Sequence, residues 1–280
     1  HRDLHYPLRR QRQMCIRDSL YNLRYSGGDG YHGQNGARYP WQPEAKTLTT
    51  TNSTRSGVTV AGSNTKLLVG HTDSVVDGSS VGATISNYPA GDNVGNSFGP
   101  TTDMKSISFN GTNQYLQTPD DSTNYQIGTG QFTAEGWMYV TDLSGGRMMF
   151  SFGTGSTIKL GFYYYSGADG SVALYDFVSS GWIAGYPVAY PNRDVVQSHR
   201  WIHLACCRDG SNNMRVFANG KLMHKSTVTT NFNNNNIMIG KRHDTSAHSM
   251  MKGYLSNLRF VKGQSLYTDT FTPPTTLLDG

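Results

Sequence analysis

The chain of 280 residues is poor in the side chains that most often carry chemistry. It has three cysteines, and its only glutamates are Glu44 and Glu135. Charged residues make up 15% of the sequence. The adjacent Cys206 and Cys207 would point to opposite faces of a strand, so they are poorly placed to pair, and neither belongs to a CxxC metal motif. The sequence therefore indicates neither a disulfide framework nor a cysteine-ligated metal.

Long apolar segments are also missing. No run of about 18 apolar residues is present, so we expect no membrane-spanning helix. Near the start, Met14-Cys15-Ile16 is too short for the apolar core of a secretory signal. The chain is instead rich in Gly, Asn, Ser, Thr and Tyr, a composition that favours short strands joined by turns.

The first 18 residues differ in character from the rest. They hold five Arg and two Asp, which is +3 of the formal net charge of +5, so the remainder carries +2. "HRDLH" and "RRQRQMCIRD", separated by three residues, resemble the translation of a transposon-based sequencing adapter. We interpret residues 1–18 as adapter sequence, with Ser19 at the join, and exclude them from the fold. The case for nucleic-acid binding depends on these basic residues and is excluded with them.

Residues 19–63 are rich in Gly, Thr and Pro and show no sustained periodicity. We interpret this segment as a linker or the tail of an upstream domain. From about residue 64 the pattern changes to short apolar runs separated by turn residues, which is typical of an all-β sandwich. Residues 64–280 are therefore expected to form one domain.

Alternation along the runs predicts which side chains share a face. In "FTAEGWMYV" one face carries four apolar residues and the other carries Glu135, Trp137 and Tyr139; the first set is Phe132, Ala134, Met138 and Val140.

Asn219-Gly220 is a strong two-residue hairpin signal. It predicts three cross-strand pairs in a ribbon covered on both sides, namely Ala218 with Lys221, Phe217 with Leu222, and Val216 with Met223.

The order of motifs carries a resemblance. "SISFNGTNQYLQTP", "GTGQFTAEGWMYV", "RWIHLACCRDGSNNMRVFANGKLM", "IMIGKR" and "GYLSNLRFVKGQSLYTDTFTPP" resemble the laminin-G-like branch of the concanavalin A-like lectin/glucanase superfamily. Similar domains occur in marine phage virion proteins and bacterial surface proteins. The resemblance implies an all-β jelly-roll sandwich of two curved antiparallel sheets, and a binding function for glycans or proteins, with calcium in some members.

Hydrolysis is disfavoured by the residues. Glycoside cleavage usually needs two carboxylates facing each other. The catalytic relatives carry them as ExDxxE on one strand, and this strand has Glu135 alone before Asp142. We expect Glu135 to be a buried, hydrogen-bonded structural carboxylate. His203, between apolar neighbours and without a GxSxG elbow, is expected to be a core histidine. We predict no catalytic residues and no enzyme activity.

Two groups of residues suit metal ions. His243, Asp244 and His248 could ligate a metal, but their spacing on a predicted loop favours a solvated loop. Asp73 and Asp77 in "HTDSVVDGSS" could hold calcium, with ordinary turn aspartates as the alternative. The resemblance often has Asp where Ser256 stands, which weighs against calcium. No other cofactor is expected.

Aromatic residues mark the expected ligand site. Residues 179–194, "SSGWIAGYPVAYPNRD", are interpreted as a long loop with three rings, and "FYYYSG" adds more. Aromatic faces stack on sugars, although the alternative is that these rings pack internally at the sheet rim. The candidate ligand-binding residues are Trp182, Tyr186, Tyr190, Asn192, Tyr163 and Tyr165.

These observations lead to a hypothesis with alternatives. The first is a non-catalytic carbohydrate-binding or adhesion module on a phage virion, tail fibre or cell surface, with a glycan or host-surface receptor as partner. A structural virion domain without a ligand is the second, and a polysaccharide hydrolase the third. Neither nucleic acid nor membrane is expected as a partner, and a homo-oligomer within a virion is left open.

Overall fold

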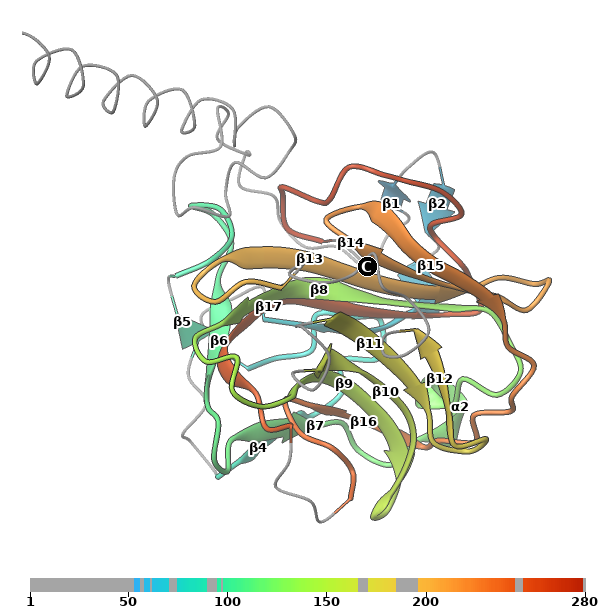
Figure 1. Cartoon of the computed structure of the whole chain (residues 1–280), viewed down its shortest axis with the longest axis horizontal. Helices are drawn as coiled ribbons and strands as arrows, with labels where there is room; N and C mark the ends of the chain where they lie inside the picture. Colours follow the sequence, from blue (N-terminus) through green and yellow to red (C-terminus); the bar gives the residue numbers. More distant parts are fainter. Residues whose placement is uncertain are drawn as a thin grey trace, which may run out of the picture.

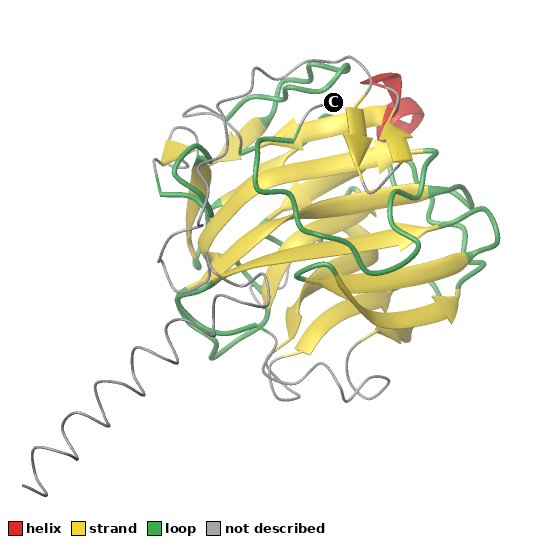
Figure 2. Cartoon of the chain, turned by 90° about the horizontal axis from the view of Figure 1, so that it is seen from above, coloured by secondary structure: helices red, strands yellow, loops and turns green. Residues whose placement is uncertain are grey.

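The computed structural model is a sandwich of two antiparallel sheets, which confirms the all-β expectation (Figure 1). Helical structure among the described residues is limited to short turns such as α2 (Ser122–Tyr125), at one corner of the sandwich (Figure 2). No helix in the described part of the chain is long and apolar enough to cross a membrane. The described residues are 53–55, 58–60, 62–70, 75–89, 95–96, 98–165, 171–184, 196–244 and 249–278.

The first layer has seven strands. Their spatial order is β12 (Gly181–Ala184), β11 (Ser171–Asp176), β10 (Thr157–Tyr165), β9 (Arg147–Thr154), β16 (Asn236–Ile239), β7 (Tyr115–Gln117) and β4 (Ser86–Tyr88).

The second layer has eight strands. Seven follow the order β15 (Lys221–Thr227), β14 (Asn213–Ala218), β13 (Trp201–Arg208), β8 (Phe132–Val140), β17 (Lys252–Lys262), β6 (Ser106–Asn110) and β5 (Gly95–Asn96), and β3 (Thr65–Val69) pairs with β17 beside β6.

The main core lies between the layers and follows strand alternation. The predicted inner face of β8 is confirmed, because Phe132, Ala134, Met138 and Val140 are all in this core. Trp137 instead belongs to a cluster on the other face of the sheet. Cys206 lies in the main core, whereas Cys207 lies under the C-terminal segment, and both are free thiols. Burial raises the pKa of the Cys207 thiol to about 11.

The β14–β15 hairpin matches the expectation at its turn. Asn219 and Gly220 have φ values of 46° and 78°, as the turn requires. The first two predicted pairs are confirmed, but Val216 pairs with His224 rather than Met223. A register irregularity between Val216 and Phe217 causes this one-residue slip. The ribbon is covered on both sides, as expected, since Val216 and Phe217 belong to different buried clusters.

Ordered structure begins before residue 64. The short strands β1 (Ser53–Arg55) and β2 (Val58–Val60) pair with each other inside the segment interpreted as a linker. Val60 is fully buried in the cluster that contains Phe217 and Tyr267. The expected boundary at residue 64 therefore lies inside the packed unit. Residues 1–52, which include the adapter-like stretch, lie outside the described residues.

Candidate functional site

The outer faces of the two sheets differ in how they are covered. The C-terminal segment crosses the outer face of the eight-stranded sheet, where Tyr267 and Phe271 stack with ring centroids 3.6 Å apart. Trp137 Nε1 donates to the Pro274 carbonyl at 3.2 Å, which holds the same segment down. Trp137 and Trp201, on the same outer face, are each 2% exposed. Partly exposed rings remain beside them at Phe98, Tyr139 and Tyr254, and a second group of partly exposed rings lies on the outer face of the seven-stranded sheet.

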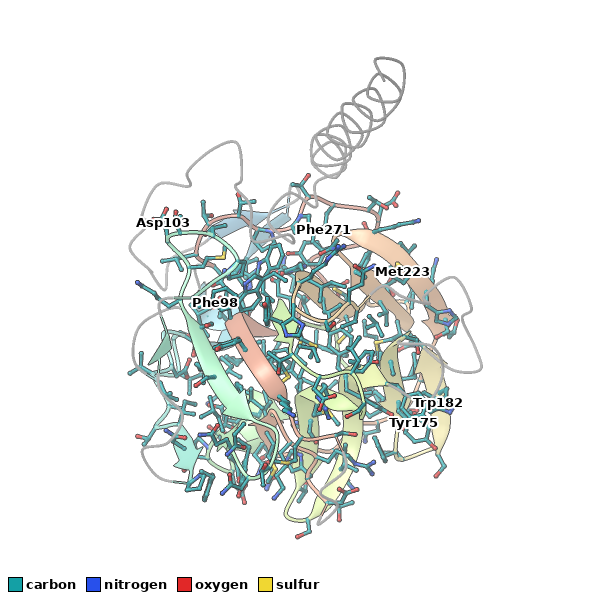
Figure 3. All side chains as sticks on the ribbon, turned by 60° about the vertical axis from the view of Figure 1, so that its left-hand side comes forward. Phe98, Asp103, Tyr175, Trp182, Met223 and Phe271 are labelled. Atoms are coloured by element: carbon teal, nitrogen blue, oxygen red, sulfur yellow. The ribbon has the colours of Figure 1, made fainter. Side chains whose placement is uncertain are left out.

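We call the ring cluster at the β12 edge of that sheet the Trp182 surface. The Trp182 indole lies 5.0 Å from the Tyr165 ring and 4.8 Å from the Tyr175 ring, measured between centroids. Phe177 continues the group at 4.6 Å from Tyr175. Figure 3 shows Tyr175 and Trp182 beside each other at the edge of the molecule. These four side chains are partly exposed, and they give a contiguous aromatic surface.

Strand alternation and register place these rings together. Leu174 and Ile183 point into the main core, so their neighbours Tyr175 and Trp182 point outward. The two outward residues are directly paired across β11 and β12. Phe177 folds back over β10 at Gly161, where an added Cβ would lie 3.1 Å from the ring.

The expected ligand residues are only partly brought together. Trp182 and Tyr165 lie on the surface, but Tyr163 is 5% exposed and packs beneath it. Burial raises the pKa of the Tyr163 hydroxyl well above its usual value. The interpretation of residues 179–194 as a loop is wrong over Gly181–Ala184, which form an edge strand. Tyr186, Tyr190 and Asn192 lie outside the described residues.

Two rings of the Trp182 surface were not among the ligand residues predicted from the sequence. Tyr175 and Phe177 occur in "SVALYDFVSSG", where nothing in the sequence marks which strand will pair with β11. The alternation of Val172, Leu174 and Asp176 against Tyr175 is a signal that could have indicated an outward ring.

The segment after β16 brings cations to the same face. The Arg242 guanidinium lies over the Phe177 ring at 4.9 Å and forms an ion pair with Asp244. Lys241 Nζ lies 4.4 Å from the centre of the Tyr115 ring.

The expectation of a solvated loop is wrong for His243. It is 3% exposed and contacts Gly153, where a Cβ would lie 2.4 Å from the imidazole. Its Nδ1 lies 2.7 Å from Ser151 Oγ, and its Nε2 contacts the Asn236 side-chain oxygen. Burial lowers the His243 pKa to about 4, so the ring is neutral at pH 7. His248 lies outside the described residues.

Of the two aspartates proposed for calcium, only Asp77 is among the described residues. Asp73 lies outside the described residues. Asp77 Oδ1 accepts hydrogen bonds from the Leu68 and Ser79 amides, and Oδ2 accepts from the Ser79 hydroxyl and the Ala83 amide. Donors that already face both oxygens suit a turn carboxylate better than a cation ligand. Within the described part of the chain, no three His, Cys, Asp or Glu side chains gather as a metal site.

Glu135 has the buried, hydrogen-bonded role that we expected. Arg259 donates to its Oε1 from Nε at 2.9 Å, and Tyr267 donates to its Oε2 at 2.7 Å. His203 Nε2 lies 3.3 Å from the same Oε2, and His203 is fully buried, as expected. This carboxylate is therefore enclosed beneath the C-terminal segment.

Comparisons with known proteins agree with the architecture. The family model described as the concanavalin A-like lectin/glucanases superfamily matches residues 110–265. No match was found among curated proteins.

Among solved structures, domain 4 of AbnA, an extracellular arabinanase from Geobacillus stearothermophilus, solved with arabinotriose, is similar with a TM-score of 0.52 and 15% identity. That alignment covers 71% of this chain and 94% of the domain.

A structure of botulinum neurotoxin type C, from a study of its interaction with two ganglioside molecules, is similar with a TM-score of 0.50 and 15% identity. This alignment covers 73% of the present chain but 49% of the toxin chain. The receptor-binding domain of a C/D mosaic toxin gives a TM-score of 0.50 at 12% identity, with the same two coverages. At these identities the solved structures establish the fold.

Proposed function

The chain belongs to the concanavalin A-like lectin/glucanases superfamily, and on that premise we propose that it is a non-catalytic carbohydrate-binding module. The observation that carries this proposal is the Trp182 surface. Its partly exposed rings offer apolar surface to the apolar face of a sugar, the tyrosine hydroxyls and the Trp182 indole supply hydrogen-bond donors, and the Arg242 guanidinium lies over Phe177. One similar structure was solved with arabinotriose, and another comes from a toxin that interacts with gangliosides, which supports a carbohydrate ligand for this chain.

The absence of catalysis is part of the proposal. Glu135 is enclosed and its oxygens are engaged by Arg259 and Tyr267, so it is not presented to a substrate. Glu44, the other glutamate, lies outside the described residues. The cluster of Glu135, Arg259 and Tyr267 is therefore suited to hold the C-terminal segment rather than to cleave a glycosidic bond.

We also place the module outside the cell, on a virion or cell surface. The support is the resemblance of the C-terminal motifs to domains of marine phage virion proteins and bacterial surface proteins. A partly open surface buries little ligand area, so single-site affinity is expected to be weak. Function on a repeated structure would then depend on multivalency.

A glycan array with two variants tests the proposal. Trp182→Leu keeps apolar bulk against Tyr175 but removes the flat ring, so it should fold and lose glycan binding. Tyr254→Ala is the matched control, because Tyr254 is a partly exposed ring on the other sheet. The proposal is contradicted if no glycan binds, as for a purely structural domain, or if Trp182→Leu folds and binds as the wild type does.

A further inference from the structure

Aromatic and basic side chains form a band across the outer face of the seven-stranded sheet. At one end is the Trp182 surface, where Trp182, Tyr175 and Phe177 follow one another at centroid distances of 4.8 and 4.6 Å. The Arg242 guanidinium then covers Phe177 at 4.9 Å. This half of the band spans β12, β11 and β10.

The second half begins at the next residue of the chain. Lys241 Nζ lies 4.4 Å from the Tyr115 ring centre, and Tyr115 stacks on Tyr88 with centroids 4.5 Å apart and planes 8° apart. Tyr115 and Tyr88 are directly paired residues of β7 and β4, the last two strands of the sheet. Leu116 points into the main core, so its neighbour Tyr115 points outward, as Trp182 does.

The centre of the band is held in place by His243. Its ring is buried against Gly153 of β9 and bridges Ser151 and Asn236, which lie on the adjacent strands β9 and β16. This anchor fixes the segment that carries Lys241 and Arg242 over the middle of the sheet. Both halves therefore lie on the same face of the sheet.

Every ring and cation of this band is at least partly exposed. Tyr88 is 40% exposed, and the others are half-buried. On the opposite sheet Trp137 and Trp201 are covered, and the partly exposed rings described there form one group, Phe98, Tyr139 and Tyr254. A ligand can therefore contact rings at both ends of the band without displacing a core side chain.

The two ring groups are far enough apart to define a ligand length. Five strand intervals separate β12 from β7, which at the usual spacing is about 24 Å. A ligand that contacts both ring groups must therefore be an extended chain of several sugar units, because a mono- or disaccharide is too short to reach from Trp182 to Tyr115. Lys241 and Arg242 lie between, where their N–H donors can meet hydroxyl or acidic oxygens.

We propose that this face binds an internal segment of a linear polysaccharide that lies across the strands, stacked on the Trp182 surface at one end and on Tyr88, the exposed ring of the Tyr88–Tyr115 stack, at the other. The inference rests on the proposed carbohydrate-binding function and adds its ligand class. It makes Tyr115 and Tyr88 a second subsite that only long chains reach.

Affinity electrophoresis in gels that contain linear arabinan, laminarin, mannan or alginate tests this. For each polysaccharide that retards the wild type, its disaccharide and its hexasaccharide are then titrated by calorimetry. Tyr115→Ala and Tyr88→Ala should each weaken binding of the polymer and the hexasaccharide by roughly three- to tenfold, and leave disaccharide binding unchanged. Trp182→Leu should weaken binding of all three. Tyr254→Ala is the control, and thermal melts verify that each variant folds. If Tyr115→Ala does not fold, Tyr88→Ala tests the second subsite alone, because Tyr88 is the most exposed ring of the band.

The outcomes separate the two claims. Retardation that depends on Trp182 but not on Tyr115 or Tyr88, with equal affinity for disaccharide and hexasaccharide, would overturn the extended site and leave a short glycan site. Absence of retardation in every gel, together with a silent glycan array, would overturn both. Retardation that depends on both ring groups, with affinity rising with chain length, supports the extended site.

Discussion

Glu135 and Arg259 form an ion pair on the outer face of the eight-stranded sheet, and neither side chain is exposed to solvent. The pair lies under the C-terminal segment, whose Tyr267 also donates to Glu135. A buried pair contributes little when both charges are removed together, but loss of one partner leaves the other uncompensated.

Glu135→Gln should therefore lower the free energy of unfolding by about 3 kcal/mol without changing glycan binding. The physical reason is the unpaired Arg259 charge, not the loss of a catalytic group. Urea denaturation measures the change, and Glu135→Met with Arg259→Met is the control, which should be less destabilised than the single variant. The non-catalytic proposal would be contradicted if the wild type releases reducing ends from the polysaccharides of the electrophoresis panel and Glu135→Gln abolishes that release.

The hairpin turn supports the C-terminal segment through Gly220. A Cβ at this position would lie 1.8 Å from the Phe271 carbonyl oxygen, and the residue has a φ of 78°. Gly220→Ala should cost about 3 kcal/mol of stability or more, because both the clash and the left-handed backbone are penalised.

Gly155→Ala provides the comparison for this turn, since Gly155 has a φ of 54° and open space around it. It should cost about 1 kcal/mol from the backbone alone. Equal losses in thermal or urea unfolding would show that the contact with Phe271 does not stabilise the fold.

Sequence patterns predicted these sheets well where one face is apolar. Phe132 and Met138 alternate with Trp137 along β8, and Asn219-Gly220 marks the turn of the β14–β15 hairpin. The slip at Val216 could not be predicted, because a bulge depends on packing with other strands. Trp182 was predicted as a site residue from its type, but its neighbour Tyr175 and the Arg242 that covers Phe177 are brought to this face only through register and a crossing loop that local sequence does not encode.

His243 predicts a pH dependence of stability. Its folded pKa of about 4 lies below its ordinary value of 6.5, so only the unfolded state takes up a proton between these pH values. The contribution of His243 is therefore fully present above pH 6.5 and is lost as pH falls toward 4, with a slope of roughly 1.4 kcal/mol per pH unit.

Urea denaturation from pH 7 to pH 4 measures this slope, and His243→Gln should reduce it by about one proton. NMR titration of the imidazole gives the folded pKa directly. An ordinary value near 6.5 would contradict the buried position of the ring.

Asp77 predicts how the domain responds to calcium. Because N–H and O–H donors face both of its carboxylate oxygens, we predict that calcium and a chelator give the same melting temperature. Asp77→Ala should still lower stability by about 1–3 kcal/mol, since amides of Leu68 and Ala83 lose their acceptor. A calcium-dependent rise in melting temperature that Asp77→Asn removes would instead establish a calcium site.

We propose that glycans bind on the seven-stranded sheet at Trp182. The chain has four tryptophans, and Trp137 and Trp201 are buried on the other sheet. Fluorine NMR of protein labelled with fluorotryptophan distinguishes them, with each signal assigned by a Trp→Phe variant, during titration with the four polysaccharides of the electrophoresis panel. We predict that the Trp182 signal shifts with saturation while those of Trp137 and Trp201 do not move. A shift of Trp137 or Trp201 with Trp182 unchanged, or no shift of Trp182 with any polysaccharide, would contradict it.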